Sequence, residues 1–216
     1  MSSERRALPR LIAITDSSLL PPTLLLERLQ RLARAARPGT VALLLRDHSL
    51  CARARLTLGR QLREVARESG QALWVADRLD LALLLEADGV HLGEGSVSPA
   101  LARSLVGQAP RISRAWHAAS LAGASAAEEL ADVDALLVSP VFEARKGRAA
   151  LGLGPLGVLG EQLRARNWAC QTYALGGVAA ENAAACREAG VAGVAAIGAA
   201  LTEDPTKLLT ALELRR

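Results

Sequence analysis

The stretches Tyr173-Ala-Leu-Gly-Gly-Val178 and Gly193-Val-Ala-Ala-Ile-Gly-Ala-Ala-Leu201 decide the fold class of this chain. In each, a short apolar run typical of a buried strand ends at glycine, and a helix-forming segment follows. Glycine lets backbone N–H groups approach a ligand closely, and helix N-termini favour anions. Two such turns on consecutive units form the phosphate site found after strands 7 and 8 of many (β/α)8 barrels. The pattern therefore predicts a barrel that binds a small phosphorylated molecule near Gly176, Gly177 and Gly198.

Short apolar runs alternate with amphipathic segments along the whole chain, which indicates a parallel sheet covered by helices. The runs predict eight strands: Leu11–Thr15, Val41–Leu45, Ala72–Val75, Gly89–Leu92, Arg111–Ser113, Asp134–Val138, Gln171–Leu175 and Val191–Ile197. Eight units favour a single (β/α)8 TIM barrel of the α/β class over an open doubly wound sheet, and no GxGxxG motif follows the first strand. We expect one domain over residues 1–216, with residues 1–10 as a flexible N-terminal extension.

The helices between these strands are predicted from their spacing and their start signals. Pro21 and Pro22 with a Thr23 cap open the first helix, and Ser98 caps another that has Pro99 in its first position. The predicted helices are Thr23–Ala36, Ala52–Ser69, Leu79–Glu86, Pro99–Val106, Leu121–Leu130, Pro155–Arg166 and Ala179–Ala189, with further helical segments after Ile197.

Composition limits the class of protein and its partners. Half of the 216 residues are apolar, only five are aromatic (three Trp, one Tyr and one Phe), and the formal charge is +4. Arginines at helical spacing, without aromatics to stack bases, argue against nucleic-acid binding. No apolar run is long enough to span a bilayer, and the start of the chain lacks a signal-peptide core. Three cysteines without CxxC spacing argue against disulfides or a thiolate metal site, so we expect a cytoplasmic protein.

Polar residues at the ends of the predicted strands are the candidates for chemistry, because the loops that follow the strands of a barrel carry its active site. Asp16 and Asp77 fit either helix caps or ligands. Arg46 follows the second strand, and His48 beside it fits a cap or a solvent-exposed residue. We interpret His91, inside an apolar strand, as a core histidine.

His117 differs from these residues because it lies on an irregular segment after a weak strand. A histidine at a strand exit is well placed to move protons near neutral pH. From its position alone, a functional and a structural role fit this residue equally well.

A loop over residues 143–154 is rich in glycine and alanine and carries Arg145 and Lys146. Long loops in compact domains are usually functional or mobile. This loop is therefore a candidate lid, with two cations for an anionic substrate.

Seven short motifs occur in order: Leu-Ile-Ala-Ile-Thr-Asp16, Leu-Leu-Arg46, Ala-Asp77-Arg-Leu-Asp80-Leu-Ala, Asp88-Gly-Val-His-Leu-Gly93, Ser139-Pro-Val-Phe142, Ala-Leu-Gly176-Gly177 and Gly193-Val-Ala-Ala-Ile-Gly198. Together they resemble the thiamine phosphate synthase/TenI superfamily from about residue 11 to 201. The resemblance implies a (β/α)8 barrel that binds thiazole phosphate through backbone amides near the glycines. It also implies one of two activities. The synthase joins a pyrimidine diphosphate to a thiazole phosphate with magnesium and releases pyrophosphate. TenI-type proteins aromatise a thiazole carboxylate phosphate by moving a proton, with a histidine as acid and base.

Several residues of the synthase pattern are replaced here. The replacements are Leu44 for glutamine, His48 for lysine, Ala76 for asparagine, Ser96 for the second metal-binding aspartate, and Glu143-Ala-Arg-Lys146 for Thr-x-Thr-Lys. Magnesium prefers carboxylates together with phosphate oxygens, so Asp77 alone makes a poor site unless Asp16 or Glu94 compensates.

The TenI-type pattern fits better, because His117 falls where that group has its acid/base histidine. The resemblance therefore implies a TenI-like thiazole tautomerase with His117 as the catalytic residue and no cofactor or metal. Arg46, Asp77, Arg145 and Lys146 are the expected substrate-binding residues. The alternatives are a divergent synthase that uses Mg²⁺, with Asp77 as a candidate ligand, and a non-catalytic regulator that binds thiazole or thiamine phosphate. A homo-oligomer is compatible with each of these.

Overall fold

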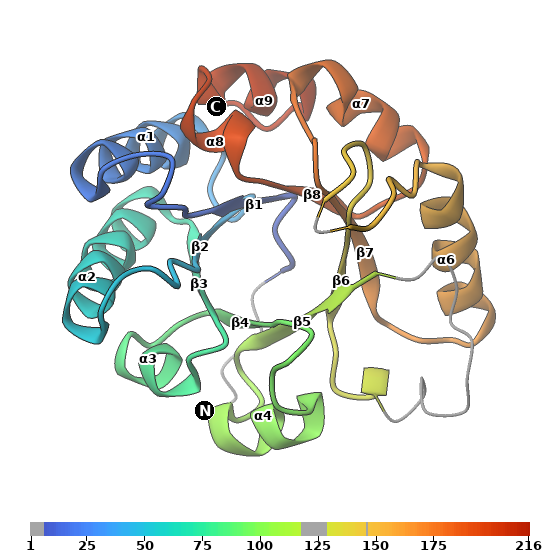
Figure 1. The fold of residues 1–216 in the computed structure, drawn as a ribbon, viewed down its shortest axis with the longest axis horizontal. Helices are drawn as coiled ribbons and strands as arrows, with labels where there is room; N and C mark the ends of the chain where they lie inside the picture. Colours follow the sequence, from blue (N-terminus) through green and yellow to red (C-terminus); the bar gives the residue numbers. More distant parts are fainter. Residues whose placement is uncertain (1–6, 118–128, 146) are drawn as a thin grey trace.

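Every strand of the chain pairs in parallel with the next, and the last strand pairs with the first to close a barrel (Figure 1). The computed structural model describes residues 7–117, 129–145 and 147–216. Within these ranges the eight strands are β1 (Leu11–Ile14), β2 (Val41–Leu45), β3 (Ala72–Ala76), β4 (Gly89–Leu92), β5 (Arg111–Trp116), β6 (Ala135–Val138), β7 (Gln171–Leu175) and β8 (Gly193–Ala196). The predicted (β/α)8 barrel is confirmed.

Helices surround the barrel on the outside (Figure 1). They are α1 (Pro22–Ala35), α2 (Ala52–Ser69), α3 (Leu79–Leu84), α4 (Pro99–Val106), α6 (Gly154–Ala165), α7 (Ala180–Glu188), α8 (Gly198–Leu201) and α9 (Pro205–Ala211). The helix predicted over residues 121–130 falls mostly on residues 118–128, which lie outside the described residues. The other predicted helices agree closely with these bounds.

One predicted helix start is confirmed and another is wrong. The Ser98 side chain accepts a hydrogen bond from the Leu101 N–H, as expected of a cap for α4. Thr23 does not cap α1, because that helix already begins at Pro22 and no side chain caps it. Proline favours the first helical position, since its φ is fixed near the helical value and it has no N–H to satisfy.

Two aromatic side chains fill the barrel interior, and each lies opposite a glycine on the neighbouring strand. Trp74 pairs with Gly89 in the β3–β4 register, and Tyr173 pairs with Gly193 in the β7–β8 register. Trp74 and Tyr173 are both almost fully buried. A Cβ atom on either glycine would lie 2.6 Å from the ring that it faces. The two glycines therefore make the space that the large side chains occupy.

The segment before β1 is fixed to the barrel by backbone contacts. The Tyr173 hydroxyl donates to the Pro9 carbonyl, and the Val194 N–H donates to the Arg10 carbonyl. The Arg10 N–H in turn donates to the Thr40 carbonyl. Residues 1–6 of the expected flexible extension lie outside the described residues. Pro9 and Arg10, which we also assigned to that extension, belong to the barrel.

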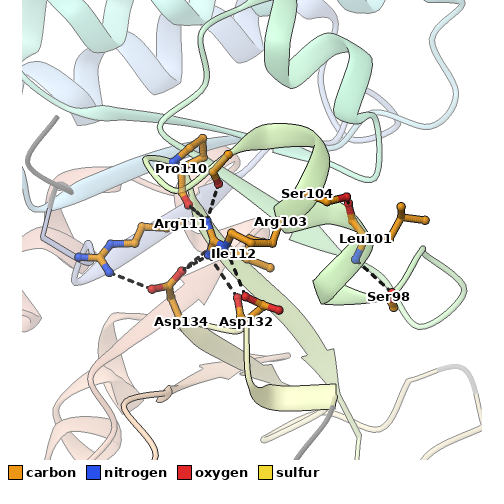
Figure 2. A network of polar contacts seen from close by, with 10 residues as sticks. Ser98, Leu101, Arg103, Ser104, Pro110, Arg111, Ile112, Asp132 and Asp134 are labelled. Carbon is orange, nitrogen blue, oxygen red and sulfur yellow. Dashed lines mark hydrogen bonds and ion pairs between the residues drawn. The ribbon is translucent and has the colours of Figure 1, made fainter. Parts of the chain in front are cut away.

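A buried ion network ties α4 to β5 and β6 at the amino ends of these strands (Figure 2). The Arg103 guanidinium donates to the Pro110 carbonyl and to the Asp134 carboxylate. Asp134 also accepts from the Arg111 side chain and from the Ile112 N–H. A buried charge pair costs desolvation energy, but removal of one partner costs more because it leaves an uncompensated charge. Loss of one of these side chains would therefore destabilise the end of the barrel that is remote from the strand exits.

Two of the three cysteines are buried. Cys51, Cys170 and Cys186 are all free thiols. Burial raises the pKa of Cys170 to about 12 and that of Cys186 to about 11, so both stay protonated at neutral pH. In the ranges that the structure describes, no helix combines the length and apolar character needed to cross a membrane.

The contact at Gly193 gives a prediction for stability. In Gly193→Ala, the new Cβ would lie 2.5 Å from the Arg10 carbonyl oxygen and 2.6 Å from the Tyr173 ring. Because neither group is the end of a flexible side chain, we expect the free energy of unfolding to fall by about 1–3 kcal/mol. Urea denaturation measures this change.

Gly154→Ala is the matched control for that measurement. Gly154 is the first residue of α6, and a Cβ there meets no atom within 4 Å. We expect this variant to be as stable as the parent or more stable by up to about 1 kcal/mol. Equal stability of both variants would contradict the tight contact at Gly193.

Candidate functional site

The carboxyl ends of the strands lead into two adjoining cavities. The first has a volume of about 370 Å³ and the second about 330 Å³. They adjoin because Arg145, Leu175, Gly176 and Ile197 line both. Strand exits of a barrel are where its chemistry is usually found.

The polar lining of the first cavity consists largely of cationic and imidazole side chains. All three histidines of the chain line it, together with three arginines and two carboxylates. These residues are His48, His91, His117, Arg46, Arg145, Arg148, Asp77 and Glu94. Such a lining suits an anionic ligand.

His117 directly follows β5, which is three residues longer than predicted. The expected irregular segment before it is therefore strand. Its Nδ1 lies 2.6 Å from the Ser139 carbonyl oxygen. Because a carbonyl only accepts hydrogen bonds, Nδ1 carries the proton of the neutral ring and Nε2 carries none. Nε2 lies 4.0 Å from Glu94 Oε2. Because His117 lines the cavity, the unprotonated Nε2 of the neutral ring is positioned to accept a proton there.

His91 is almost fully buried on β4, and its Nδ1 lies 3.0 Å from Ser113 Oγ. Burial lowers the pKa of His91 to about 4, although the nearby Asp77 carboxylate opposes the shift. His91 is therefore neutral at pH 7. It is hydrogen bonded like a core histidine, and it also forms part of the cavity wall.

Asp16 and Arg46 form an ion pair between the first two strand exits. Arg46 Nη2 lies 2.7 Å from Asp16 Oδ2. Asp16 Oδ1 also accepts hydrogen bonds from the Ser18 N–H and hydroxyl. Burial raises the pKa of Asp16, but these hydrogen bonds and the Arg46 charge outweigh it, so the pKa lies below its ordinary value. Asp16 is thus an ionised carboxylate with partners.

Asp77 connects two loops of the rim and caps no helix. Its Oδ1 accepts from the Gly93 N–H at 2.9 Å and from the Ser96 hydroxyl. Its Oδ2 faces His48 Nε2 at 3.9 Å. The residue adopts φ +60°, in the left-handed region, so its backbone turns sharply after β3.

The carboxylates of the rim do not converge on one point. Asp16 is paired with Arg46, Asp77 is hydrogen bonded to Ser96, and Glu94 is paired with Arg148. Among the described residues, no three His, Cys, Asp or Glu side chains form a cluster that could hold a metal ion. Mg²⁺ is usually held by one or two carboxylates together with substrate phosphates. Each of these carboxylates is already held by a partner of its own, so the donor set as it stands does not fit the ion.

The second cavity is lined by the glycines that follow β7 and β8. Gly176 and Gly177 have φ of +97° and +72°, and Gly198 begins α8. A Cβ on Gly177 would lie 2.6 Å from Glu143 Cγ, so the turn lies close against the β6–α6 loop. The Asn182 side chain accepts from the Ala179 N–H and donates to the Gly177 carbonyl. This side chain fixes the turn that lines the cavity.

The loop over residues 143–154 folds back on itself at the mouth of the first cavity. Arg145 and Arg148 exchange two backbone hydrogen bonds of 3.0 Å, around Gly147 at φ +74°. Arg148 Nη2 contacts both carboxylate oxygens of Glu94, at 3.0 and 2.8 Å. Arg148 was not among the residues predicted from the sequence. Its position three residues after Arg145, with Gly147 between them, is the sequence feature that could have indicated it. Lys146 lies outside the described residues.

Comparison with known proteins agrees with this architecture. Residues 11–200 match the family described as thiamine monophosphate synthase. The chain belongs to this family. It is similar to the thiamine-phosphate synthase of Thermus thermophilus, with 37% identity over 190 residues that cover 87% of this chain and 88% of that protein. It is also similar to a putative thiamine-phosphate synthase of Geobacter sulfurreducens, with 36% identity over 177 residues that cover 81% and 80% of the two proteins.

A solved structure extends the comparison to the fold of the family. The thiamine phosphate pyrophosphorylase of Pyrococcus furiosus superposes with a TM-score of 0.76 at 24% identity, over 94% of this chain and 95% of that one. At this identity the likeness shows the fold alone. The superfamily predicted from the sequence is confirmed, and the closer relation to TenI-type proteins stays a prediction.

The shifted pKa of His91 gives a prediction for stability against pH. Because the folded-state value of about 4 lies below the ordinary 6.5, the unfolded chain binds an extra proton between these pH values. The stability that the fold gains from a neutral His91 is fully present above pH 6.5 and is lost as pH falls towards 4. We expect a loss on the order of 3 kcal/mol in the free energy of unfolding.

The variant His91→Asn separates this contribution from those of the carboxylates. An asparagine amide can still bond to Ser113 but does not titrate. We expect urea denaturation between about pH 4 and pH 8 to show a smaller pH dependence in this variant than in the parent. Parallel pH profiles would show that His91 does not stay neutral in the fold.

Proposed function

We propose that this chain is a thiamine-phosphate synthase, which joins a pyrimidine diphosphate to a thiazole phosphate and releases pyrophosphate. The observation that carries the proposal is the pair of adjoining cavities with a shared wall of Arg145, Leu175, Gly176 and Ile197. A reaction between two substrates needs two sites that meet, whereas a proton shift within one molecule needs one. The synthase names of the relatives support the same choice. We therefore place the synthase before the tautomerase, whereas the sequence favoured the tautomerase.

Each cavity suits one of the two substrates. The second cavity offers closely approachable backbone at Gly177 and Gly198 and the Arg145 side chain, which suit the single phosphate of the thiazole. Asp16, Glu143 and Glu203 also line it and oppose an anion. The first cavity offers Arg46, Arg145 and Arg148, which suit a diphosphate because guanidinium groups bind phosphate oxygens in a fork geometry. The reacting ends of the substrates would then meet at the shared wall.

The arginines of the first cavity would hold the charge that develops on the leaving group of this reaction. The bond between the pyrimidine group and the diphosphate breaks as the bond to the thiazole forms, and negative charge builds up on the departing pyrophosphate. Guanidinium groups can hold that charge through charge-assisted hydrogen bonds to the phosphate oxygens. The resemblance implies Mg²⁺ for this step, but the paired carboxylates described above do not fit the ion.

A direct assay tests the synthase proposal. The purified protein is supplied with both substrates, and thiamine phosphate is measured over many turnovers. We expect Arg145→Ala, at the shared wall, to lower kcat/KM by about 10- to 100-fold, because a hydrogen bond to a charged group is lost. Arg34→Ala is the control, since Arg34 is an exposed arginine on α1 that pairs with Glu68. The absence of product in the parent, or equal effects of the two substitutions, would contradict the proposal.

A second candidate function rests on His117. In the neutral ring, whose Nδ1–H donates to the Ser139 carbonyl, Nε2 is the nitrogen that can act as a base, and His117 lines the first cavity. In a thiazole tautomerase, His117 would take and return the proton that moves when the ring becomes aromatic. If the assay with thiazole carboxylate phosphate shows aromatisation, we expect His117→Ala to abolish it while the phosphorylated ligand still binds. Turnover of this substrate without synthase activity would put the tautomerase first.

A further inference from the structure

Guanidinium groups outnumber carboxylates in the first cavity. Arg46, Arg145 and Arg148 line it, against Asp77 and Glu94. The histidines add neutral or positive groups and no negative one. The lining residues thus carry one positive charge in excess, and Arg46 is also paired with Asp16, which does not line this cavity. An anion that binds here therefore exchanges with carboxylates that already hold the arginines.

Both carboxylates of the cavity have partners in the free protein. Asp77 Oδ1 accepts hydrogen bonds from the Gly93 N–H and the Ser96 hydroxyl. These bonds hold the carboxylate in place as a link between two loops. Its second oxygen faces the His48 imidazole at 3.9 Å rather than another carboxylate.

Glu94 occupies the position of an anion on Arg148. Arg148 Nη2 contacts both Glu94 oxygens, at 3.0 and 2.8 Å. The pair is partly exposed, with 65% of the Glu94 side chain accessible, so the carboxylate can leave when another anion arrives. A phosphate oxygen makes the same charge-assisted hydrogen bonds to a guanidinium as a carboxylate does.

We propose that this protein holds a diphosphate group with its own cations instead of a divalent metal ion, and that the anion displaces Glu94 from Arg148. The inference rests on the proposed function for the identity of the ligand. Arg46 and Arg145 hold the diphosphate from the rim, and Arg148 joins them on the β6–α6 loop. Glu94 is the counter-ion of Arg148 in the free protein.

Binding of inorganic pyrophosphate tests the metal independence directly. Isothermal titration calorimetry with the full chain is done in EDTA and again in Mg²⁺, after correction for the complex that Mg²⁺ forms with pyrophosphate. We expect the two dissociation constants to agree within about threefold. Binding that appears only with Mg²⁺, or that is stronger with Mg²⁺ by about tenfold or more, would overturn the inference.

Two variants test the exchange of partners on Arg148. Glu94→Gln removes the competing charge, so we expect pyrophosphate to bind about fivefold more tightly in EDTA. Arg148→Ala removes the cation, and we expect affinity to fall by about tenfold or more. If Glu94 were instead a metal ligand, Glu94→Gln would weaken binding in Mg²⁺, and that result would overturn the inference.

The controls remove a comparable ion pair elsewhere on the molecule. Arg34 and Glu68 form an exposed pair at 3.2 Å between α1 and α2, and neither residue lines the cavity. We expect Arg34→Ala and Glu68→Gln to leave pyrophosphate affinity unchanged. Equal shifts in the control and cavity variants would show a general charge effect and overturn the inference.

The binding measurement and the synthase assay together distinguish failure of the inference from failure of the proposed function. Pyrophosphate binding in EDTA without thiamine phosphate formation removes the proposed function and leaves the metal-independent anion site. Thiamine phosphate formation with pyrophosphate binding only in Mg²⁺ keeps the proposed function and removes the inference. Absence of pyrophosphate binding in both conditions overturns the inference as well.

Discussion

The filling of the barrel interior is the constraint on which the rest of the structure depends. An eight-stranded barrel has room for one set of inward side chains, and this chain uses two large rings opposite two glycines. Trp74 faces Gly89, and Tyr173 faces Gly193. The second pair also fixes the segment before β1, since the Tyr173 hydroxyl bonds to the Pro9 carbonyl. Closure then brings every strand exit to one rim, where residues far apart in the sequence line the same cavities.

Most of the fold could be predicted because apolar runs and glycine turns are local signals. The length of β5 could not, since Arg114 interrupts the apolar pattern there. In the structure, pairing with β4 and β6 extends the strand to Trp116. The Arg114 side chain is satisfied by the carbonyls of Gly93 and Glu94. Contacts between strands, which the sequence does not display, thus override the local pattern and place His117 directly at a strand exit.

For the candidate site, the sequence predicts which residues contribute but not which of them pair with one another. The polar residues at the strand ends could be recognised from their positions alone. Their partners could not, because the Arg46–Asp16 and Arg148–Glu94 pairs join loops that are 30 and 54 residues apart. These pairings decide which charges are free for a ligand. They engage Arg46 and Arg148 together with their carboxylates, so an anion that binds to these arginines has to exchange with Asp16 or Glu94.

Ser96 shows how one residue changes the chemistry of its neighbour. In the sequence, Ser96 stands where the family resemblance expects a second metal-binding aspartate. The sequence therefore indicates only that one metal ligand is missing. In the structure the Ser96 hydroxyl also donates to Asp77, so it engages the remaining carboxylate as well. A serine here therefore lowers the negative charge of the rim and turns Asp77 into a link between two loops. With these carboxylates engaged, the proposed synthase reaction would rely on arginines to hold the charge of the departing pyrophosphate.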